Sequence, residues 1–371
     1  MNEIEAVLIL THAPFLGPVK IRQLIEQCGS AEKALLSIVN QEPLAINLRK
    51  ESQQYLLNYE KESSWKEDLL CANCSNTQLI PFTSDEFPSK LKTLSDCPPL
   101  LYVQGKLSND LPSIAIIGTR ASSFYGNNMA ATFAEFFSKN GIVVISGLAR
   151  GIDTHAHIGA LKSGSTSSLT WGLIGSGLNC LYPEENKKLA ATIAKHGAVI
   201  SEYPMNTAPT KFTFPRRNRL VAALSDAIVL IEAPQKSGAM ITMELGRAQK
   251  KALFAISNRA QSDSFQGNHF LIKQGFARLV DDPNEIIQEL GWNQKNIQLA
   301  PSSANSTSTR ETFFSFDEKK IIDLLKAKEA SLDDLSGQIS LSTTTLQVTL
   351  MRLVLRKIIL ELPGKRYTLV Q

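Results

Sequence analysis

Six short apolar runs, separated from one another by segments of helical character, constrain the fold of this chain more than any other feature. A run that is apolar without alternation is typical of a strand buried on both faces, and such strands belong to parallel sheets. Helices between successive parallel strands form βαβ units. We therefore expect an α/β fold built on a doubly wound, mostly parallel sheet between about Leu79 and Leu290. The six runs are Ile114–Ile117, Val143–Ile145, Leu173–Ile174, Ala198–Ile200, Ala227–Ile231 and Leu253–Ile256.

The segments on either side of the sheet region differ from it in pattern. Before it, Gly17-Pro18 can open a helix, Gly29 can close it, and Ser30 can cap the next one. A glycine turn between short helices is similar to helix-hairpin-helix modules, which hold DNA backbones, and a packing domain without a ligand explains it equally well. The sequence predicts a helical domain at 1–75, the sheet domain at 76–290, a flexible linker at 291–312 and a small domain at 313–371.

The last of these domains follows a polar stretch that lacks the apolar residues needed to order itself. Three helical segments and a hairpin turning at Pro363-Gly364 predict a winged helix. Arg352 and Arg356 come only near the end of the third helix, so DNA reading, protein contact and simple capping all remain open for this domain. The residues that can cap its helices are Asp317, Ser331 and Ser342.

Charge and cysteine content exclude several classes of protein. The 371 residues carry a net charge of +4, which permits a nucleic-acid partner without demanding one. No apolar stretch is long enough to cross a bilayer, and Met1–Glu5 is acidic where a secretory signal would be basic, so we expect a cytoplasmic protein without a membrane partner. The odd, scattered set of five cysteines predicts reduced thiols. Cys71 and Cys74 lack the second pair of ligands that a zinc site needs.

The stretch Lys211–Arg219 predicts an anion site. It places one lysine, two aromatic rings and three arginines around Pro215, which suits the first position of a helix. Arginines in the first turn add positive charge where the helix dipole is already positive, an arrangement that favours a bound anion. Phosphate fits best, because guanidinium matches it with paired hydrogen bonds. Phe212 and Phe214 can both be core residues, and we assign stacking on a base to one of them.

Three further loops are expected at the same edge of the sheet. In doubly wound sheets, ligands bind beyond the carboxyl ends of the strands, and glycine lets backbone N–H groups approach an anion. Alternatively, these arginines have a structural role and pair with carboxylates instead of binding an anion. We expect roughly one in three of them to do so, because arginine is rarely buried without a partner. The available carboxylates are Asp153, Glu202, Asp226 and Glu232. The loops are Gly118–Gly126, Ser146–Asp153 and Pro234–Gly238.

Other motifs carry no chemistry that we would assign. Gly175-Ser176-Gly177 lacks the third glycine of a dinucleotide fingerprint, since Cys180 stands there. Asp153 and His157 can share a helix face, but His155 cannot, and no other ligand completes a metal shell. No nucleophile elbow and no acid–base pair is evident. We therefore expect no catalytic residue, no metal and no cofactor.

The ordered set of motifs between Leu79 and Leu290 resembles the DNA-processing protein A family (DprA, also called Smf). The motifs are Ile114–Arg120, Ile145–Asp153, Leu181–Asn186, Ser201–Pro204, Phe214–Arg219 and Ser237–Thr242. The resemblance implies a Rossmann-like domain that binds single-stranded DNA, protects incoming DNA during natural transformation and helps load the RecA recombinase. It also implies a homodimer that is not an enzyme.

Family contacts carry over onto Gly118, Arg120, Lys211 and Phe214. The full set of nucleic-acid-binding residues that we expect is Gly118, Arg120, Ser123, Gly147, Arg150, Gly151, Lys211, Phe214, Arg216, Arg217, Asn218, Arg219, Ser237 and Gly238. The chain departs from the family pattern at Asn179, at Ser257-Asn258 and at His269, which concerns one pocket wall and the dimer edge.

One other function and one other DNA-binding site remain open. A nucleotide-processing enzyme, similar to a phosphoribohydrolase, would use the Ser237-Gly238 loop and Thr242, with Glu244 as the nearest carboxylate. Alternatively, the winged helix rather than the sheet domain binds DNA.

Overall fold

The structure is a computed structural model that describes residues 1–109, 111–163, 170–292, 321–322, 324–325, 329–338, 343–355, 358–362 and 366–369. The chain divides into two compact units, Met1–Ala300 and Pro301–Gln371. Several expected features lie outside the described residues: the linker beyond 292, the caps at Asp317 and Ser342, Arg356 and the turn at Pro363-Gly364. In the described part of the chain, no helix is both long and apolar enough to cross a membrane.

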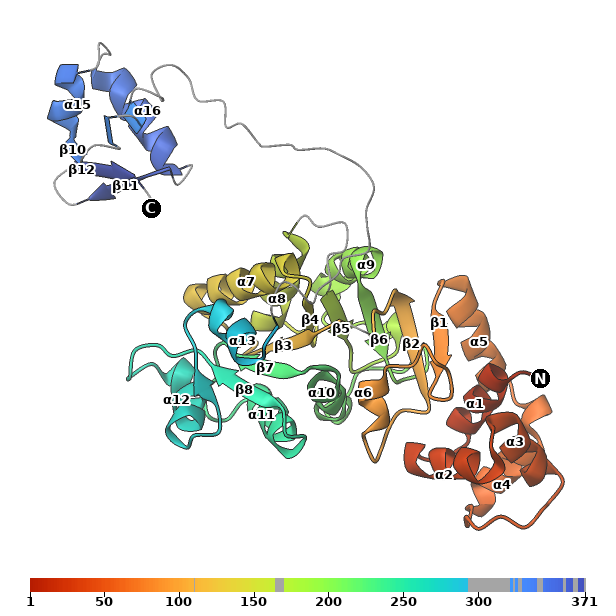
Figure 1. Cartoon of the computed structure of the whole chain (residues 1–371). Coiled ribbons are helices and arrows are strands. Elements are labelled where there is room, and N and C mark those ends of the chain that lie inside the picture. Colours follow the sequence, from red (N-terminus) through yellow and green to blue (C-terminus); the bar gives the residue numbers. More distant parts are fainter. Residues whose placement is uncertain are drawn as a thin grey trace. The chain divides into compact units, whose positions relative to one another are not determined.

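A nine-stranded sheet, counted over the described residues, forms the centre of the first unit (Figure 1). Its order is β1-β2-β6-β5-β4-β3-β7-β8-β9, parallel from β6 to β9, with β1 and β2 antiparallel at one edge. All six predicted strands are confirmed, and with them the Rossmann-like fold. The strands are β1 (Gln78–Pro81), β2 (Leu100–Gly105), β3 (Ser113–Ile117), β4 (Val143–Ser146), β5 (Thr170–Leu173), β6 (Ala198–Ser201), β7 (Ala227–Leu230), β8 (Ala252–Ala255) and β9 (Arg278–Leu279).

The strand order reverses at β3. From β3 the chain adds β4, β5 and β6 on one side and then returns to add β7 and β8 on the other, so Ile114 pairs with both Val144 and Ala227. Loops that follow the strands on either side of such a switch point run in opposite directions and leave a crevice between them. The topology therefore places the expected ligand site beside the carboxyl end of β3.

Helices cover both faces of the sheet because the central strands, β3 to β7, are buried on both sides. Ile114 and Ile116 pack with α7, α8 and α13, whereas Ala115 and Ile117 pack with α10 and α11. Figure 1 shows these two groups of helices on opposite sides of the strands. The helices are α6 (Ser89–Lys92), α7 (Phe124–Lys139), α8 (Ile152–Leu161), α9 (Lys187–His196), α10 (Thr213–Leu224), α11 (Gly238–Ala248), α12 (Gln266–Lys273) and α13 (Pro283–Glu289), with short 3-10 turns η2 (Leu178–Cys180), η3 (Glu184–Asn186) and η4 (Asp263–Phe265).

The N-terminal helices pack against the β1–β2 edge and share a core with β6 and α9. The helix boundaries expected around Gly17, Gly29 and Ser30 are confirmed: Gly29 takes φ +84°, and the Ser30 side chain accepts a hydrogen bond from the Lys33 N–H. The elements are α1 (Glu3–His12), α2 (Pro18–Cys28), α3 (Ala31–Val39), α4 (Lys50–Leu57), η1 (Tyr59–Lys61) and α5 (Ser64–Cys74).

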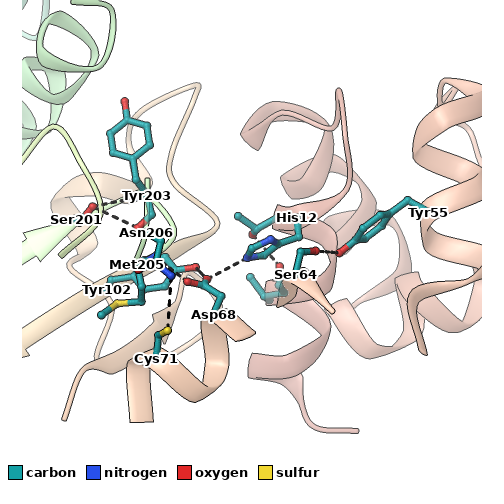
Figure 2. A network of polar contacts seen from close by, with 12 residues as sticks. His12, Tyr55, Ser64, Asp68, Cys71, Tyr102, Ser201, Tyr203, Met205 and Asn206 are labelled. Carbon is teal, nitrogen blue, oxygen red and sulfur yellow. Dashed lines mark hydrogen bonds and ion pairs between the residues drawn. The ribbon is translucent and has the colours of Figure 1, made fainter. Parts of the chain in front are cut away.

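A buried carboxylate joins these helices to the sheet (Figure 2). Asp68 of α5 accepts hydrogen bonds from His12 Nε2 (3.0 Å), from the Tyr102 hydroxyl (2.5 Å) and from the Met205 N–H (2.7 Å). A buried carboxylate is tolerated only when donors satisfy it, and here they come from α1, β2 and the loop after β6. Nearby, Cys71 accepts a hydrogen bond from Asn206, and all five cysteines are free thiols.

The described residues of the second unit include a small antiparallel sheet of order β10-β12-β11, the helices α15 and α16, and helical residues at 321–322 and 324–325. The β11–β12 pair is the hairpin expected near the C-terminus, and Ser331 caps α15 as expected, with its hydroxyl accepting from the Asp334 N–H. The winged-helix assignment stays a prediction. The elements are β10 (Ala330–Ser331), α15 (Leu332–Gln338), α16 (Thr343–Leu355), β11 (Ile359–Leu362) and β12 (Arg366–Leu369).

Candidate nucleic-acid interface

A cavity of about 500 Å³ opens at the switch point, where the loops after β3, β4 and β7 meet the start of α10. We call it the switch-point cavity. All four segments that the sequence singled out contribute to its walls. The expected site residues that line it are Gly118, Arg120, Gly147, Lys211, Phe214, Arg217, Asn218, Ser237 and Gly238.

Glycine is required at positions in these loops for two different physical reasons. A Cβ at Gly118 would lie 2.5 Å from the Ile152 side chain, and one at Gly147 would overlap the Arg217 guanidinium. Gly151 takes φ +73°, a left-handed conformation that other residues adopt only under strain. Only Gly238 faces open space, so its backbone is accessible at the N-terminus of α11. Close packing explains Gly118 and Gly147, and backbone conformation explains Gly151, so none of the three requires an anion for its explanation.

The helix that carries the arginines begins two residues earlier than expected. α10 starts at Thr213, because the Thr210 hydroxyl accepts hydrogen bonds from the backbone N–H groups of Phe212 and Thr213. The expectation that Pro215 occupies the first helical position is therefore wrong. Proline is tolerated one turn in because the first N–H groups of a helix have no partner within it.

Arg217 forms part of the cavity wall from a buried position. It is 4% exposed, and its Nη1 donates to the carbonyl of Leu173 at 2.7 Å. Burial lowers the pKa of Arg217 to about 10, an effect opposed by the nearby Asp153 carboxylate, so the guanidinium stays charged at neutral pH. Asp153 accepts hydrogen bonds from the N–H groups of Gly147 (3.1 Å) and Ala149 (3.4 Å), and burial raises its pKa.

Two of the expected contacts serve the fold instead. Arg219 is buried, donates to Glu202 at 2.5 Å and lies 2.8 Å from Asp96, and it does not line the cavity. Ser123 donates to Glu232 at 2.8 Å and caps α7 by accepting from the Gly126 N–H. The pairing of Arg219 with Glu202 matches the expectation that carboxylates take up some of the arginines.

Two more arginines lie at the margin of the cavity. Arg216 is half exposed, and its Nε is 3.9 Å from Glu202. Arg150 pairs with Glu185 and lies over the Tyr182 ring at 5.9 Å, beside the main cavity. Neither lines the switch-point cavity. Of the carboxylates that we considered as partners, Asp226 pairs with Lys90 instead, at 2.7 Å.

Guanidinium and ammonium groups cover the aromatic rings of the site. Arg120 Cζ lies 5.1 Å from the centroid of the half-buried Phe214 ring, and Lys211 Nζ lies 5.2 Å from that of Phe212. Both distances fall within the range of cation–π contacts. Phe212 is 74% exposed, so neither ring belongs to the core, and the sequence interpretation missed Phe212 as a surface ring. It also missed Lys236, which lines the cavity. Lys236 lies in the Pro234–Gly238 loop that the sequence singled out, but it was not among the expected binding residues.

The departures from the family pattern lie in two places: Asn258 and His269 lie near the end of β8, whereas Asn179 lies in η2 and donates to the Asn206 side chain at 2.8 Å. Asn268 is buried, and its amide donates to the carbonyls of Leu230, Ile231 and Ile256 while accepting from the Ala233 N–H. Those bonds tie the ends of β7 and β8 together just before Pro234 enters the cavity wall. His269 and Asn258, two of the departing residues, contact each other, with Nε2 3.0 Å from the Asn258 carbonyl.

The histidines near this site are packed rather than grouped around a metal position. His157 is buried, its Nδ1 lies 2.7 Å from the Thr170 hydroxyl, and burial lowers its pKa to about 3. The ring of His155 bonds to the Gly151 carbonyl. Within the described ranges, no three His, Cys, Asp or Glu side chains form a cluster that could hold a metal ion.

A doubly wound sheet with cations, aromatic rings and an open helix N-terminus at its switch point defines a Rossmann-like protein suited to phosphate-bearing ligands. The sequence model of one family, DNA recombination-mediator protein A, matches residues 78–291. The chain belongs to that family.

Individual relatives agree with this assignment. Protein Smf of Escherichia coli is 36% identical over 232 residues, 62% of this chain and 61% of that protein. DNA processing protein DprA of Bacillus subtilis is 33% identical over 59% of this chain and 72% of its own length. The chain thus spans less than two thirds of Smf.

Solved structures of the family have the same fold. The DprA structure from Streptococcus pneumoniae matches with a TM-score of 0.65 and 28% identity over 78% of this chain and 98% of that one. DNA processing protein A from Helicobacter pylori matches with a TM-score of 0.53 and 32% identity over 59% of this chain and 98% of that one. The latter structure is described as revealing a single-stranded DNA binding mode of that protein.

Proposed function

We propose that the chain binds single-stranded DNA in the switch-point cavity, protects it, and helps load RecA onto it during natural transformation. The observation that carries this proposal is the Arg120–Phe214 pair at the cavity wall, with Lys211 beside it. In such a pair the guanidinium group can bind a phosphate, and the aromatic ring can stack on a base. Family membership and the binding mode described for the Helicobacter pylori protein support the same ligand.

The charge of the lining favours a polyanion. Arg120, Lys211, Lys236 and Arg217 contribute positive charge, and Asp153 is the one carboxylate among the described lining residues. Asp153 is already engaged by two backbone N–H groups, which leaves the cations on the opposite walls available. A phosphate can therefore enter without meeting an unpaired negative charge.

The preference for single strands follows from access to the faces of the bases. The rings of a duplex are stacked and paired, so Phe214 can contact a base face only where the strand is unpaired. A cavity of about 500 Å³ is large enough to take one nucleotide away from its neighbours, but not a double helix.

The test is fluorescence anisotropy with labelled oligonucleotides over a series of salt concentrations. We expect tighter binding to a single strand than to blunt duplex, and a loss of affinity in Arg120→Ala and in Lys211→Ala. Lys139→Ala is the matched control, because Lys139 is exposed at the far end of α7 and pairs with Glu135. Equal or tighter binding to duplex, or unchanged affinity in the Arg120→Ala and Lys211→Ala double variant, would contradict the proposal.

Assembly with RecA and with a second copy belongs to the same proposal. Two cavities joined in a homodimer would bind one strand with higher avidity than either alone. Light scattering measures the assembly state. The loading step is tested by the rate of RecA filament formation on single strands, measured with and without the protein. An unchanged rate would refute the proposal that the protein helps load RecA.

We infer that the site acts without catalysis. Glu244, the carboxylate that a phosphoribohydrolase-like mechanism would need, is exposed, pairs with Arg247 at 2.6 Å and does not line the cavity. The lining carboxylate Asp153 is held by the backbone. A nucleoside-monophosphate turnover assay tests this inference, and turnover that disappears in Glu244→Gln would establish the enzyme instead.

A further inference from the structure

A second, smaller lobe adjoins the switch-point cavity and has no role in the function proposed so far. It shares Arg120 and Phe214 with the main cavity and adds Arg150, Tyr182 and Pro183. The shared residues show that the two hollows lie side by side. A strand lying against Phe214 is therefore within reach of Tyr182, whose ring centroid is 5.9 Å from that of Phe214.

The groups of the two lobes form a row in which two adjacent rings lie between two guanidinium groups. The centroid of the Tyr182 ring is 5.9 Å from that of Phe214, at an interplanar angle of 56°. Arg120 Cζ lies 5.1 Å from the centre of the Phe214 ring, and Arg150 Cζ lies 5.9 Å from that of the Tyr182 ring. Each ring in the row thus has a cation beside it, the same combination that marks the main cavity.

The exposure of Tyr182 is not explained by packing. Tyr182 is 42% exposed, although Pro183 beside it is buried. Asn186, four residues later, is buried and donates to the Leu148 carbonyl and to the Thr154 hydroxyl, both at 2.9 Å. Asn186 thus fixes the η3 segment against the loop after β4, and this leaves Tyr182 facing the second lobe.

We propose that Tyr182 is a second stacking platform for single-stranded DNA and that Arg150 contacts the phosphate next to the base stacked there. The inference rests on the proposed function, because it assumes that a strand occupies the main cavity. Phe214 then holds one base and Tyr182 a neighbouring one, with Arg120 and Arg150 at the two ends of the row. The ligand is a stretch of at least two nucleotides rather than a single one.

Glu185 has a defined part in this arrangement. In the free protein it pairs with Arg150, and both side chains are about half exposed. An ion pair so accessible to water is easily exchanged, so a phosphate can replace the carboxylate. Glu185 then lies close to the strand as a like charge, and its removal strengthens binding.

The central test compares Tyr182→Leu with Tyr182→Phe by anisotropy, using a single-stranded oligonucleotide of about 20 nucleotides. Aromatic stacking contributes about 1–3 kcal/mol per base, and for a half-exposed ring we take the lower end, so Tyr182→Leu weakens binding about 5- to 10-fold. Tyr182→Phe keeps the ring and leaves the affinity unchanged. Thermal melting of both variants checks that the fold is retained.

The outcomes separate this inference from the proposed function. If Tyr182→Leu binds like the unchanged protein while Arg120→Ala binds weakly, the second platform is refuted and the proposed function stands. An equal loss in Tyr182→Leu and Tyr182→Phe also refutes stacking. If the unchanged protein does not bind single strands, the proposed function fails first.

Charge at the second lobe gives an independent readout. Arg150→Gln reduces the salt dependence, the slope of log K against log salt, by about 0.7 for the one phosphate released. Glu185→Gln tightens binding several-fold at low salt, whereas Glu184→Gln, which alters a neighbouring exposed carboxylate paired with Lys187, has a smaller effect. An unchanged slope in Arg150→Gln, or weaker binding in Glu185→Gln, overturns the assignment of Arg150.

Discussion

Replacing Gly147 by alanine perturbs the wall of the switch-point cavity without removing a charged group. The added Cβ would overlap Nη1 of Arg217 and lie 2.5 Å from its Cζ. Arg217 cannot move aside freely, because it is 4% exposed and donates to the Leu173 carbonyl at 2.7 Å. The substitution therefore displaces a buried guanidinium from its hydrogen bond.

The expected cost follows from two contributions. A hydrogen bond from a charged group is worth about 1.5–3 kcal/mol, and overpacking a close-packed site costs about 1–3 kcal/mol. We expect Gly147→Ala to lower the free energy of unfolding by about 3–5 kcal/mol and the melting temperature by on the order of 10 °C. Affinity for single strands, measured where the variant is still folded, falls as well, because Arg217 lines the cavity.

Denaturant unfolding measures the change, and two variants control it. Gly238→Ala adds a Cβ that meets nothing within 4 Å, so its stability should change by no more than about 0.5 kcal/mol. In an Arg217→Ala background the overlap is removed, so adding Gly147→Ala should cost less than about 1 kcal/mol. If Gly147→Ala costs the same with and without Arg217, the steric reasoning is wrong.

Three further predictions concern buried charge. Arg219→Ala leaves Glu202 buried without its 2.5 Å partner, so it should lower the free energy of unfolding by about 3–5 kcal/mol without a loss of DNA affinity. Arg216→Ala, the control, should change the free energy of unfolding by no more than about 0.5 kcal/mol. Comparable costs of the two substitutions would contradict the structural role of Arg219. Asp68→Ala removes the acceptor of His12, Tyr102 and the Met205 N–H, the network drawn in Figure 2. It should lower the free energy of unfolding by about 3 kcal/mol, measured by thermal unfolding. An unchanged stability would contradict the contribution of this network. Burial, reinforced by Arg217, lowers the pKa of His157 to about 3, so below pH 6.5 the unfolded chain binds a proton that the folded chain refuses. Stability should then fall by roughly 1.4 kcal/mol per pH unit as the pH drops from 6.5 toward 3, and an equally steep fall in His157→Gln would exclude this cause.

The sequence was most informative where structure is determined locally. Continuous apolar runs identified six of the seven parallel strands that the structure describes, because burial on both faces leaves a clear pattern. It missed β9, which is two exposed residues, and the antiparallel pair β1 and β2, which lie at an edge outside the βαβ pattern. The start of α10 was misplaced because the Thr210 side chain, and not Pro215, determines where the helix begins.

The site was predictable as a region but not residue by residue. Motifs and topology brought four loops to one edge of the sheet, and they meet in one cavity. Which arginines face that cavity depends on partners distant in the sequence: Arg217 bonds to Leu173, and Arg219 to Glu202. Such pairings depend on how strands and helices pack, so no local pattern reveals them. The exposure of Phe212 and Tyr182 could not be predicted for the same reason.

The most direct measurement of the central claim is photocrosslinking of a single strand containing bromodeoxyuridine, followed by mapping of the crosslinked peptides. The account predicts crosslinks to the segments that carry Phe214 and Tyr182, and their loss in Arg120→Ala with Lys211→Ala. Crosslinks confined to α16 and the β11–β12 hairpin, or to the α2–α3 turn, would place the DNA elsewhere and contradict it.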